Sequence, residues 1–256
     1  MQILLACAKT MTSEISRMPE HTTIPEFQSQ ASANAMSMGC YSVADLENML
    51  KVNNAIASET WHRYHDFFVD STRVPAGMAY DGIVFKRLGL DSFPDEALAY
   101  ANTHLNICSF LYGLLRPLDL INPYRLEGHV ELQINGGKSM FESWRPLLTD
   151  YLINKTQADD GILVNLASDE MRLLFDWRKV AKSVNVITPV FKVEKQGRLR
   201  TVVVYAKMCR GAMTRHILLN RLSDPGGLAT FDYEGFTYSP ELSASPSSPL
   251  FVLPAL

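Results

Sequence analysis

Apolar and polar positions are spaced differently in the two halves of the chain. Residues 1–6 form an apolar run that predicts a strand, and the polar residues up to about residue 26 predict a segment that crosses the surface. From there to about residue 120, apolar residues recur at intervals of three and four, as in helices packed on a core. We therefore expect the first half to be mainly helical after its opening strand.

Two consecutive helices are predicted within this helical half. Residues 42–45 have the spacing of a capping box, which satisfies the free N–H groups at the start of a helix. Residues 52–54 read as a turn, so the two helices form a hairpin. The apolar stripes of the two helices are Leu46, Met49 and Leu50, followed by Ala57, Thr60, Trp61, Tyr64 and Phe68.

The second half has the composition of strands. Residues 162–167, 184–193 and 199–207 are rich in β-favouring side chains. Residues 201–205 are an unbroken run of this kind, as expected of a strand buried on both faces. Gly197 lies between two of these runs and predicts a hairpin turn.

The last helix is predicted at about residues 212–222, before the Asp-Pro-Gly-Gly sequence at 224–227. This order of elements predicts a mixed α/β (α+β) fold and not a regular βαβ alternation, so we do not expect a Rossmann fold. Because no repeat or linker divides the chain, we expect one compact domain over residues 1–256, with a mixed sheet and surrounding helices.

The composition is that of a folded protein. The chain has 256 residues, 47% of them hydrophobic, and a formal net charge of −3, which excludes a disordered chain. No apolar run approaches the roughly 18 residues of a membrane span, and no basic leader precedes the first strand. We therefore expect a cytoplasmic protein with no membrane partner.

The cysteines show no metal or redox spacing, so we interpret them as buried thiols in a reducing compartment. The alternative is a thiolate stabilised by neighbouring cations at Cys7 or Cys209. The four cysteines are Cys7, Cys40, Cys108 and Cys209.

Positive charge is concentrated in one segment. Residues 165–222 hold twelve Lys/Arg against four Asp/Glu, although the whole chain is acidic. A polyanion would bind this segment if its basic side chains converge in space, whereas a solvated basic face is the simpler interpretation.

The densest polar cluster in an apolar setting is LYGLLRPLDLINPYRLE, residues 111–127. Its charged residues are Arg116, Asp119, Arg125 and Glu127, some of which must be desolvated and paired. One interpretation is a structural arginine–carboxylate network. The other is an anion or substrate site, for which arginine supplies bidentate geometry.

A second candidate segment is NLASDE, residues 165–170, which follows a predicted strand and precedes a helix. Ser168 is placed to cap that helix, and Asn165 ends the strand. Free N–H groups at such a junction favour an anion. Glu170 instead suits a cation, an amine or a general-base role.

The third candidate segment is AKMCRGAMTRHILLNRL, residues 206–222. Lys207 and Arg210 are expected at a strand-to-helix junction, and Thr214 and Arg221 are expected on one face of the helix. Together they predict a phosphate-binding edge. An amphipathic helix with solvated arginines is the alternative.

Metal and cofactor motifs are weak. His62, His65 and Asp66 have a spacing that permits a metal, but no third strong ligand is nearby, so we interpret the histidines as facing solvent or DNA. P-loop, GxGxxG, GxSxG and HExxH patterns are absent from the sequence. We expect no metal and no cofactor.

Taken in order, these segments resemble the YaaA family of bacterial peroxide-stress proteins, also called UPF0246. The matching pieces are AKT at 8–10, the segments at 111–127, 165–170 and 206–222, Val190-Phe191, and FDYEGF at 231–236. The AKT match adds Lys9 and Thr10 to the candidate cleft residues.

The resemblance implies a single-domain fold with a basic cleft and a helix-hairpin-helix element. It implies a cytoplasmic protein that keeps unincorporated iron low during peroxide stress and binds DNA. The paired helices at about 43–68 correspond to that element, with Lys51, Asn53 and Asn54 in its hairpin.

The chain departs from the family pattern in three places. Ala6-Cys7 replaces the usual Ser-Pro, the hairpin lacks the glycines that allow close phosphate approach, and the basic C-terminal end is missing.

Two main hypotheses follow. The first is a monomeric stress protein, without established catalytic activity, that binds DNA through the basic cleft, non-specifically or by structure. The second is an enzyme acting on a small phosphorylated or nucleotide-like substrate, since a DNA groove has little use for buried carboxylates. A deep pocket lined by both signs favours the second, and a shallow positive groove favours the first. Direct iron binding is a weaker third possibility.

Overall fold

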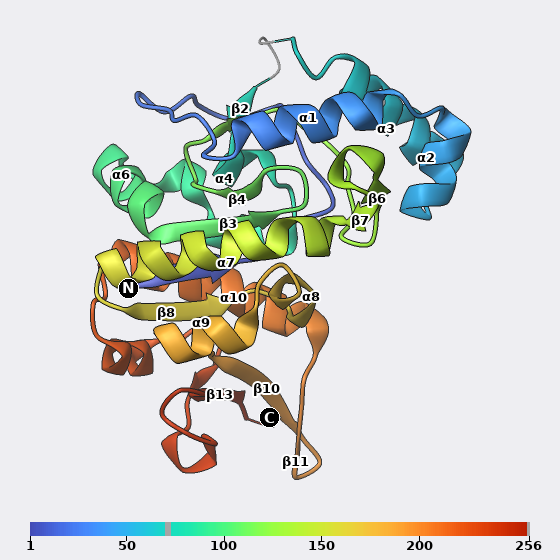
Figure 1. Cartoon of the computed structure of the whole chain (residues 1–256). Coiled ribbons are helices and arrows are strands. Elements are labelled where there is room, and N and C mark those ends of the chain that lie inside the picture. The colour runs from blue at the N-terminus through green and yellow to red at the C-terminus, as the bar shows by residue number, and fades with distance from the viewer. Residues whose placement is uncertain (70–72, 255–256) are drawn as a thin grey trace.

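The computed structural model describes residues 1–69 and 73–254 (Figure 1). Its main sheet has the strand order β4-β3-β1-β8-β9, in which β3, β1, β8 and β9 are parallel and β4 is antiparallel. The predicted mixed α/β class is confirmed. The strands are β1 (Gln2–Leu5), β3 (Leu105–Ser109), β4 (Gly113–Leu115), β8 (Ile162–Leu166) and β9 (Asn185–Ile187).

The central strands are buried on both faces because helices cover the sheet on two sides. Ile3 in β1 pairs with Leu105 on one side and Val164 on the other, and all three are fully buried. α7 and α9 contact each other on one face, whereas α10 lies on the other face together with α5 and α6 (Figure 1). These helices are α5 (Ile83–Leu88), α6 (Asp95–His104), α7 (Met140–Ala158), α9 (Trp177–Ser183) and α10 (Val203–Leu219).

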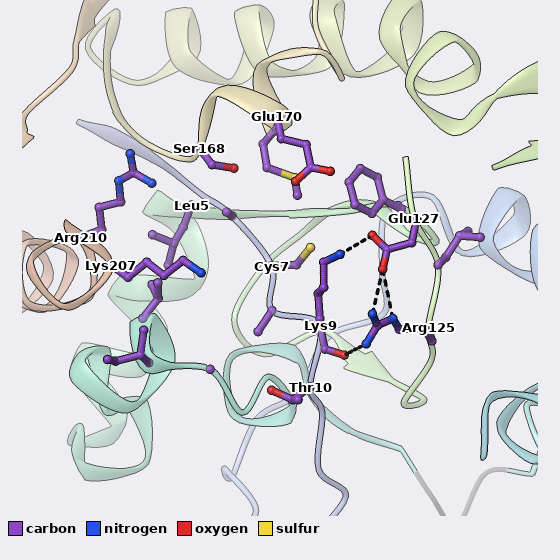
Figure 2. Close-up of a pocket in the computed structure, with 18 of the residues that line it drawn as sticks. Leu5, Cys7, Lys9, Thr10, Arg125, Glu127, Ser168, Glu170, Lys207 and Arg210 are labelled. Atoms are coloured by element: carbon purple, nitrogen blue, oxygen red, sulfur yellow. Dashed lines mark hydrogen bonds and ion pairs between the residues drawn. The ribbon is translucent and has the colours of Figure 1, made fainter. Parts of the chain in front are cut away.

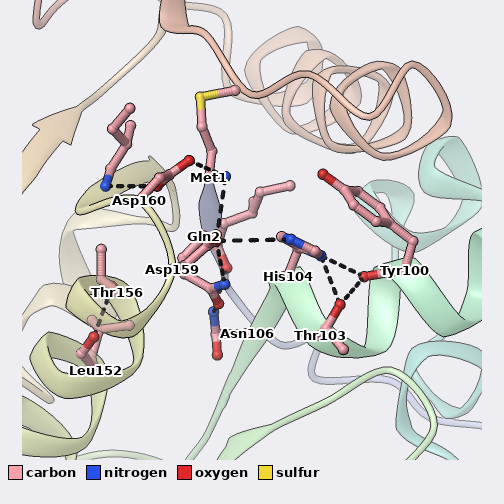
Figure 3. A network of polar contacts seen from close by, with 12 residues as sticks. Met1, Gln2, Tyr100, Thr103, His104, Asn106, Leu152, Thr156, Asp159 and Asp160 are labelled. Carbon is pink, nitrogen blue, oxygen red and sulfur yellow. Dashed lines mark hydrogen bonds and ion pairs between the residues drawn. The ribbon is translucent and has the colours of Figure 1, made fainter.

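A polar network ties together the amino-terminal end of the sheet (Figure 3). The ammonium of Met1 lies 2.7 Å from Asp160 Oδ2 and 3.4 Å from Asp159 Oδ2. Gln2 donates to Asp159 Oδ2 at 2.9 Å and accepts from Asn106 Nδ2 at 3.1 Å. Buried polar side chains are thus satisfied between β1, β3 and the end of α7.

The predicted helical hairpin is confirmed. It consists of α2 (Val43–Leu50) and α3 (Asn54–His65), and Ser42 and Asp45 form the capping box of α2. Leu46 and Leu50 are buried, as their stripe predicts. Phe68 was expected on the second helix, but it lies beyond the end of α3 with 53% of its surface exposed.

The prediction of helix up to residue 120 is wrong over residues 105–115, which form β3 and β4. This segment, LNICSFLYGLL, is buried throughout. Apart from Asn106 and Ser109 the segment is apolar and shows no alternation, so periodicity does not distinguish a buried strand from a buried helix. The error matters because β3 ends beside the candidate site.

A second sheet has the order β11-β10-β13-β12. The predicted turn at Gly197 is confirmed: Gln196 and Gly197 have φ values of 53° and 70° and join β10 to β11 in an antiparallel hairpin. The run at 184–193 is divided between β9 and β10. The strands of this sheet are β10 (Val190–Lys195), β11 (Arg198–Arg200), β12 (Thr237–Tyr238) and β13 (Leu250–Leu253).

The predicted strand at residues 201–207 and the predicted helix start at 212 are both wrong. β11 ends at Arg200, and α10 begins at Val203. Val203 and Val204 are 66% and 47% exposed, so this run is not buried on both faces. β11 is an edge strand without a further partner strand among the described residues, and packing of α10 against α5 outweighs the β-propensity of three valines.

Shorter elements complete the described chain. The helices are α1 (Gln28–Gly39), α4 (Ala76–Ala79), α8 (Asp169–Arg172), η2 (Leu90–Ser92), η3 (Gln133–Asn135), η4 (Pro225–Thr230) and η5 (Pro240–Leu242). The strands are β2 (Val74–Pro75), β5 (Leu120–Ile121), β6 (Glu131–Leu132) and β7 (Lys138–Ser139). Over residues 1–69 and 73–254, none of the helices has the length and apolar character needed to cross a bilayer.

Candidate functional site

A pocket of about 350 Å³ opens at the carboxyl ends of β1 and β8. The connection from β1 ends in α6 on one face of the sheet, whereas β8 continues into α9 on the other (Figure 1). Two adjacent parallel strands whose connections leave on opposite faces create a crevice at their carboxyl ends, where α/β proteins bind ligands. The topology therefore places this pocket at the preferred position for a ligand.

Eight of the predicted cleft residues line this pocket, although they come from four separate segments of the chain (Figure 2). They are Lys9, Thr10, Arg125, Glu127, Ser168, Glu170, Lys207 and Arg210.

One wall is a charged cluster built around Glu127, which is only 4% exposed. Lys9 Nζ lies 3.0 Å from Glu127 Oε2, and Arg125 Nη2 lies 3.0 Å from Oε1. Arg125 also donates through Nε to Oε1 at 3.1 Å and through Nη1 to the carbonyl oxygen of Lys9 at 3.4 Å (Figure 2). A buried carboxylate with two cations is well compensated, so this cluster carries one net positive charge.

Hydrogen bonds within the core hold the segment that carries this cluster. The Tyr124 hydroxyl lies 2.7 Å from Ser109 Oγ, at the end of β3, and 2.9 Å from the Tyr80 hydroxyl. The Tyr64 hydroxyl of α3 donates to the carbonyl oxygen of Arg125 at 2.8 Å. Burial raises the pKa of Tyr124 well above its ordinary value, so the phenol stays a neutral partner in this network.

The opposite wall is α10, from which Lys207 and Arg210 reach toward the pocket (Figure 2). Lys207 is exposed and Arg210 is half-buried. Burial lowers the pKa of Arg210, and Asp169 partly opposes this effect. Neither side chain has a hydrogen-bond or ion-pair partner among the described residues, so both are available to an anion.

These two residues lie inside α10 and not at a strand-to-helix junction as predicted, because the helix begins at Val203. Their spacing of three places them on one face of the helix. The two cations therefore lie side by side as predicted, although the predicted start of the helix was wrong.

Thr10, Ser168 and Glu170 complete the polar lining. The Thr10 hydroxyl donates to the carbonyl oxygen of Asp81. Ser168 occupies the predicted N-cap position of α8, but its side chain makes no capping hydrogen bond. Glu170 is exposed and has no ion-pair partner in the described part of the chain. An anion near Ser168 would thus have a carboxylate as neighbour.

Cys7 lines the pocket two residues after the end of β1, and it is half-buried. Burial raises the pKa of its thiol to about 12, and the charges of Glu170 and Glu127 add to the effect. The cation-stabilised thiolate considered at Cys7 is therefore wrong, and so is that at Cys209, whose pKa burial raises to about 12. Cys40 is exposed at the end of α1, against the expectation of a buried thiol.

The remaining predicted residues lie outside this pocket. Arg116 and Asp119 form an ion pair at 2.8 Å, and Asp119 is fully buried. Asn165 is buried and accepts from the Ala167 backbone, and the Thr214 hydroxyl donates to the carbonyl oxygen of Arg210 at 2.8 Å. The segment 111–127 therefore holds two ion pairs with different roles. The Arg116–Asp119 pair stabilises a loop, and the Arg125–Glu127 pair lines the pocket.

Arg221 was expected to share a helix face with Thr214, but α10 ends at Leu219 and Arg221 lies beyond it with a φ of 49°. Its guanidinium is 3.7 Å from Glu96 and lies over the ring of Tyr100. Arg221 therefore points to α6 and not to the pocket.

The pocket also contains residues that the sequence analysis did not select, including Phe110, Tyr124, Met171 and residues 82–84. Phe110 directly follows β3, so recognising that strand would have pointed to it, whereas Tyr124 lies within the candidate segment 111–127. Nothing in the sequence indicated residues 82–84, which reach the pocket through the contact of α5 with α10.

The histidines considered as metal ligands have other contacts. The ring of His65 stacks on Trp61 with centroids 3.6 Å apart, and its Nδ1 bonds the Trp61 carbonyl oxygen. Within residues 1–69 and 73–254, no three His, Cys, Asp or Glu side chains gather in a geometry that would hold a metal ion.

In the helical hairpin, Lys51 is exposed and adopts the left-handed conformation with a φ of 53°. Asn53 caps α3 by accepting from the backbone of Ile56, and Asn54 donates to Glu47. Both asparagines thus stabilise the hairpin itself.

These features define a mixed α/β protein with a recessed, mixed-charge pocket at the carboxyl edge of a parallel sheet. A family model described as "Peroxide stress protein YaaA" matches residues 1–242. The chain is 52% identical over 244 residues to a UPF0246 protein of Bacteroides fragilis and 50% identical over 239 residues to one of Phocaeicola vulgatus, covering 95% and 93% of this chain and 95% and 94% of those proteins. A UPF0246 protein of Porphyromonas gingivalis is 44% identical over 257 residues, which cover 99% of this chain and all of that protein. The chain belongs to the YaaA (UPF0246) family of peroxide stress proteins.

Proposed function

We propose that this YaaA-family protein binds a small phosphorylated or nucleotide-like anion in the pocket between β1, β8 and α10. The observation that carries the proposal is the position of Lys207 and Arg210, two cations without partners in the described chain, across the pocket from the Lys9–Glu127–Arg125 cluster. A volume of about 350 Å³ suits a small molecule.

The mixture of charges supports a small ligand over a nucleic-acid backbone. The free carboxylate of Glu170 would repel a continuous row of phosphates, and the buried carboxylate of Glu127 occupies Lys9 and Arg125, which backbone phosphates would otherwise contact. Glu170 has the position to accept an N–H or O–H group of a ligand whose phosphate is held by Arg210 and Lys207. If the protein turns this ligand over, Glu170 is the candidate general base, and Glu170→Gln should then abolish turnover while phosphate binding is retained.

Binding of inorganic phosphate and of AMP, measured by calorimetry at low salt, tests the proposal. We expect Lys207→Ala and Arg210→Gln each to weaken binding about tenfold to a hundredfold, as for loss of a charge-assisted hydrogen bond. Lys182→Ala is the matched control, because Lys182 is exposed outside the pocket. No measurable binding to the wild-type protein, or equal loss in the control, would contradict the proposal.

DNA binding is the second candidate. It is supported by the position of the helical hairpin beside the segment that carries Arg125 and Glu127. His129 Nε2 lies 3.1 Å from the carbonyl oxygen of Met49, and the Tyr64 hydroxyl donates to the carbonyl oxygen of the pocket residue Arg125. Residues 42–66 carry four carboxylates against two cations, which opposes phosphate approach at the hairpin. DNA held through lysine and arginine would bind with a salt slope near −0.9 per phosphate contacted. Titration of duplex and branched DNA at two salt concentrations distinguishes this candidate. DNA that lies across the cleft and the hairpin requires that both Arg210→Gln and Lys51→Ala reduce the slope, whereas binding of phosphate or AMP should be unaffected by Lys51→Ala.

Family membership supports a role in the response to peroxide, and we propose that the protein acts as a cytoplasmic monomer that keeps unincorporated iron low. If the pocket is responsible, cells that carry Arg210→Gln in place of the wild-type protein will accumulate unincorporated iron after peroxide exposure, as measured by electron paramagnetic resonance. Size-exclusion chromatography with light scattering measures the oligomeric state.

A further inference from the structure

A second pocket, of about 380 Å³, lies beside the edge strand β4, at the opposite end of the main sheet from the pocket described above. It is formed by α6, α7 and the residue that follows β4. Its lining residues are Asn102, Thr103, Arg116, Tyr151, Asn154 and Lys155. A lysine and an arginine thus line a cavity that shares no residue with the proposed anion site.

Lys155 is held in one orientation. Its side chain is half-buried, and Nζ donates to Asn106 Oδ1 at 2.8 Å. Asn106 is 1% exposed and is itself fixed, because its Nδ2 donates to Gln2 Oε1 and to the carbonyl oxygen of Ile3, both at 3.1 Å. Among the described residues, no carboxylate lies within ion-pair distance of Nζ. The amine is therefore positioned by an amide and not neutralised by an acid.

Burial favours the neutral form of the Lys155 amine. Burial lowers its pKa to about 8, and the positive charge of Arg116 adds to that effect. Asp119, Glu26 and Asp159 act in the opposite direction without cancelling it. Since an ordinary lysine titrates near 10.4, a far larger fraction of Lys155 is uncharged at neutral pH.

Arg116 supplies a cation to the same pocket. Its Nε and Nη2 donate to Asp119 Oδ1, and Nη2 also donates to the carbonyl oxygen of Ile24 at 2.6 Å. Its Nη1 has no acceptor in the part of the chain that the structure describes. An anionic group on a ligand would find a fixed guanidinium within the cavity that holds the amine.

We propose that Lys155 is a nucleophilic amine that condenses with a small aldehyde or ketone bearing a carboxylate or phosphate, whose charge Arg116 attracts. The nitrogen lone pair forms a C–N bond to the carbonyl carbon while the C=O π electrons move to oxygen. Both amine protons leave with that oxygen as water, and the nitrogen lone pair completes the C=N bond. Lysine and carbonyl compound thus give an imine and one water.

The test uses the whole protein with glyoxylate as the probe and cyanoborohydride as the reductant, which delivers hydride to the imine carbon. Peptide mass spectrometry then measures carboxymethylation at each lysine. At pH 7.5 we expect Lys155 to react at least about tenfold faster than the exposed Lys182. Lys155→Arg should remove this adduct and leave that at Lys182 unchanged. Labelling of Lys155 at or below the rate of Lys182 would overturn the proposal.

Two further measurements separate a reactive amine from a merely structural one. Labelling of Lys155 should rise with pH to a plateau with its midpoint near pH 8. Glycolaldehyde, which lacks the carboxylate, should label Lys155 several-fold more slowly than glyoxylate relative to Lys182, and Arg116→Lys should reduce that preference. Equal relative rates for the two aldehydes would show that Arg116 does not attract the carboxylate of the ligand. A rate of Lys155 labelling that still rises at pH 10 would show that Lys155 titrates as an ordinary lysine and is not the proposed nucleophile.

Discussion

Gly211 of α10 lies directly against the backbone of Val84 in α5, so that a Cβ atom at position 211 would overlap the Val84 carbonyl oxygen. The same Cβ would stand 3.0 Å from the Cβ of Arg87. Because Lys207 and Arg210 occupy the turn of α10 just before Gly211, this contact sets how far the two cations extend into the pocket.

Gly211→Ala should therefore destabilise the protein and weaken anion binding. Overpacking against backbone costs about 1 to 3 kcal/mol, of which the better helix propensity of alanine offsets up to about 1 kcal/mol. Urea unfolding measures the change in the free energy of unfolding, and phosphate titration measures the change in affinity. Gly39→Ala is the control, since its Cβ would meet nothing closer than 3.8 Å. Equal stability of the two variants would show that α10 adjusts freely.

Asp119→Ala should be among the most destabilising single changes in the chain. The fully buried carboxylate accepts from the Arg116 backbone at 2.7 Å, from its guanidinium, and from Thr23 Oγ1 at 2.6 Å. Its removal leaves these donors unpaired, at a cost of about 3 to 5 kcal/mol. In contrast, Asp169→Ala removes an ion pair at 3.6 Å from a carboxylate that is 99% exposed, and should change stability by less than about 1 kcal/mol. Denaturant unfolding of both variants measures the difference.

Acid should weaken the network at the amino-terminal end of the sheet (Figure 3). Although burial raises the pKa of Asp159, the hydrogen bond from Gln2 and the charges of the Met1 ammonium and His104 outweigh it, and the pKa lies below its ordinary value of 3.8. The stabilisation is therefore complete above about pH 5 and is lost as the pH falls through the lowered pKa. Asp159→Asn should cost about 1 to 2 kcal/mol at pH 7 and much less at pH 3. A difference that does not change between these pH values would contradict this assignment.

Cys7 should alkylate slowly although it lines an open pocket. Burial, followed by Glu170 and Glu127, raises the pKa of its thiol to about 12, so almost no thiolate is present at pH 8. Iodoacetamide should modify the exposed Cys40 first, as followed by peptide mass spectrometry. Glu170→Gln removes one of the negative charges and should accelerate alkylation of Cys7 but not of Cys40. Faster reaction of Cys7 than of Cys40 in the wild-type protein would show that the pocket supplies net positive potential at the sulfur.

Features that depend on neighbouring residues were predictable from the sequence. The capping box of Ser42 and Asp45, the turn at Gly197 and the strand that begins the chain all form as expected, because each is determined by interactions within a few residues. The family resemblance is likewise confirmed, since it rests on the order of motifs and not on their geometry.

Two segments adopt a secondary structure that their own residues did not predict. Residues 105–109 form a strand because β1 offers a parallel partner. Residues 203–205 become helical because they continue into a helix buried against α5, which no property of three valines indicates. In both cases distant contacts override local propensity.

The sequence and the tertiary structure also determine different properties of the candidate site. The sequence by itself determined the supply of charged residues, the motifs that carry them and the family to which they belong. Only the tertiary structure decided that Arg125 and Glu127 line a pocket with Lys207 and Arg210 while Arg116 and Asp119, from the same motif, lie elsewhere. The physical reason is that side chains six to eleven residues apart in the sequence, such as Asp119 and Arg125 or Arg116 and Glu127, can point to different ends of a sheet. Convergence in space follows from strand order and helix packing, which sequence distance does not encode.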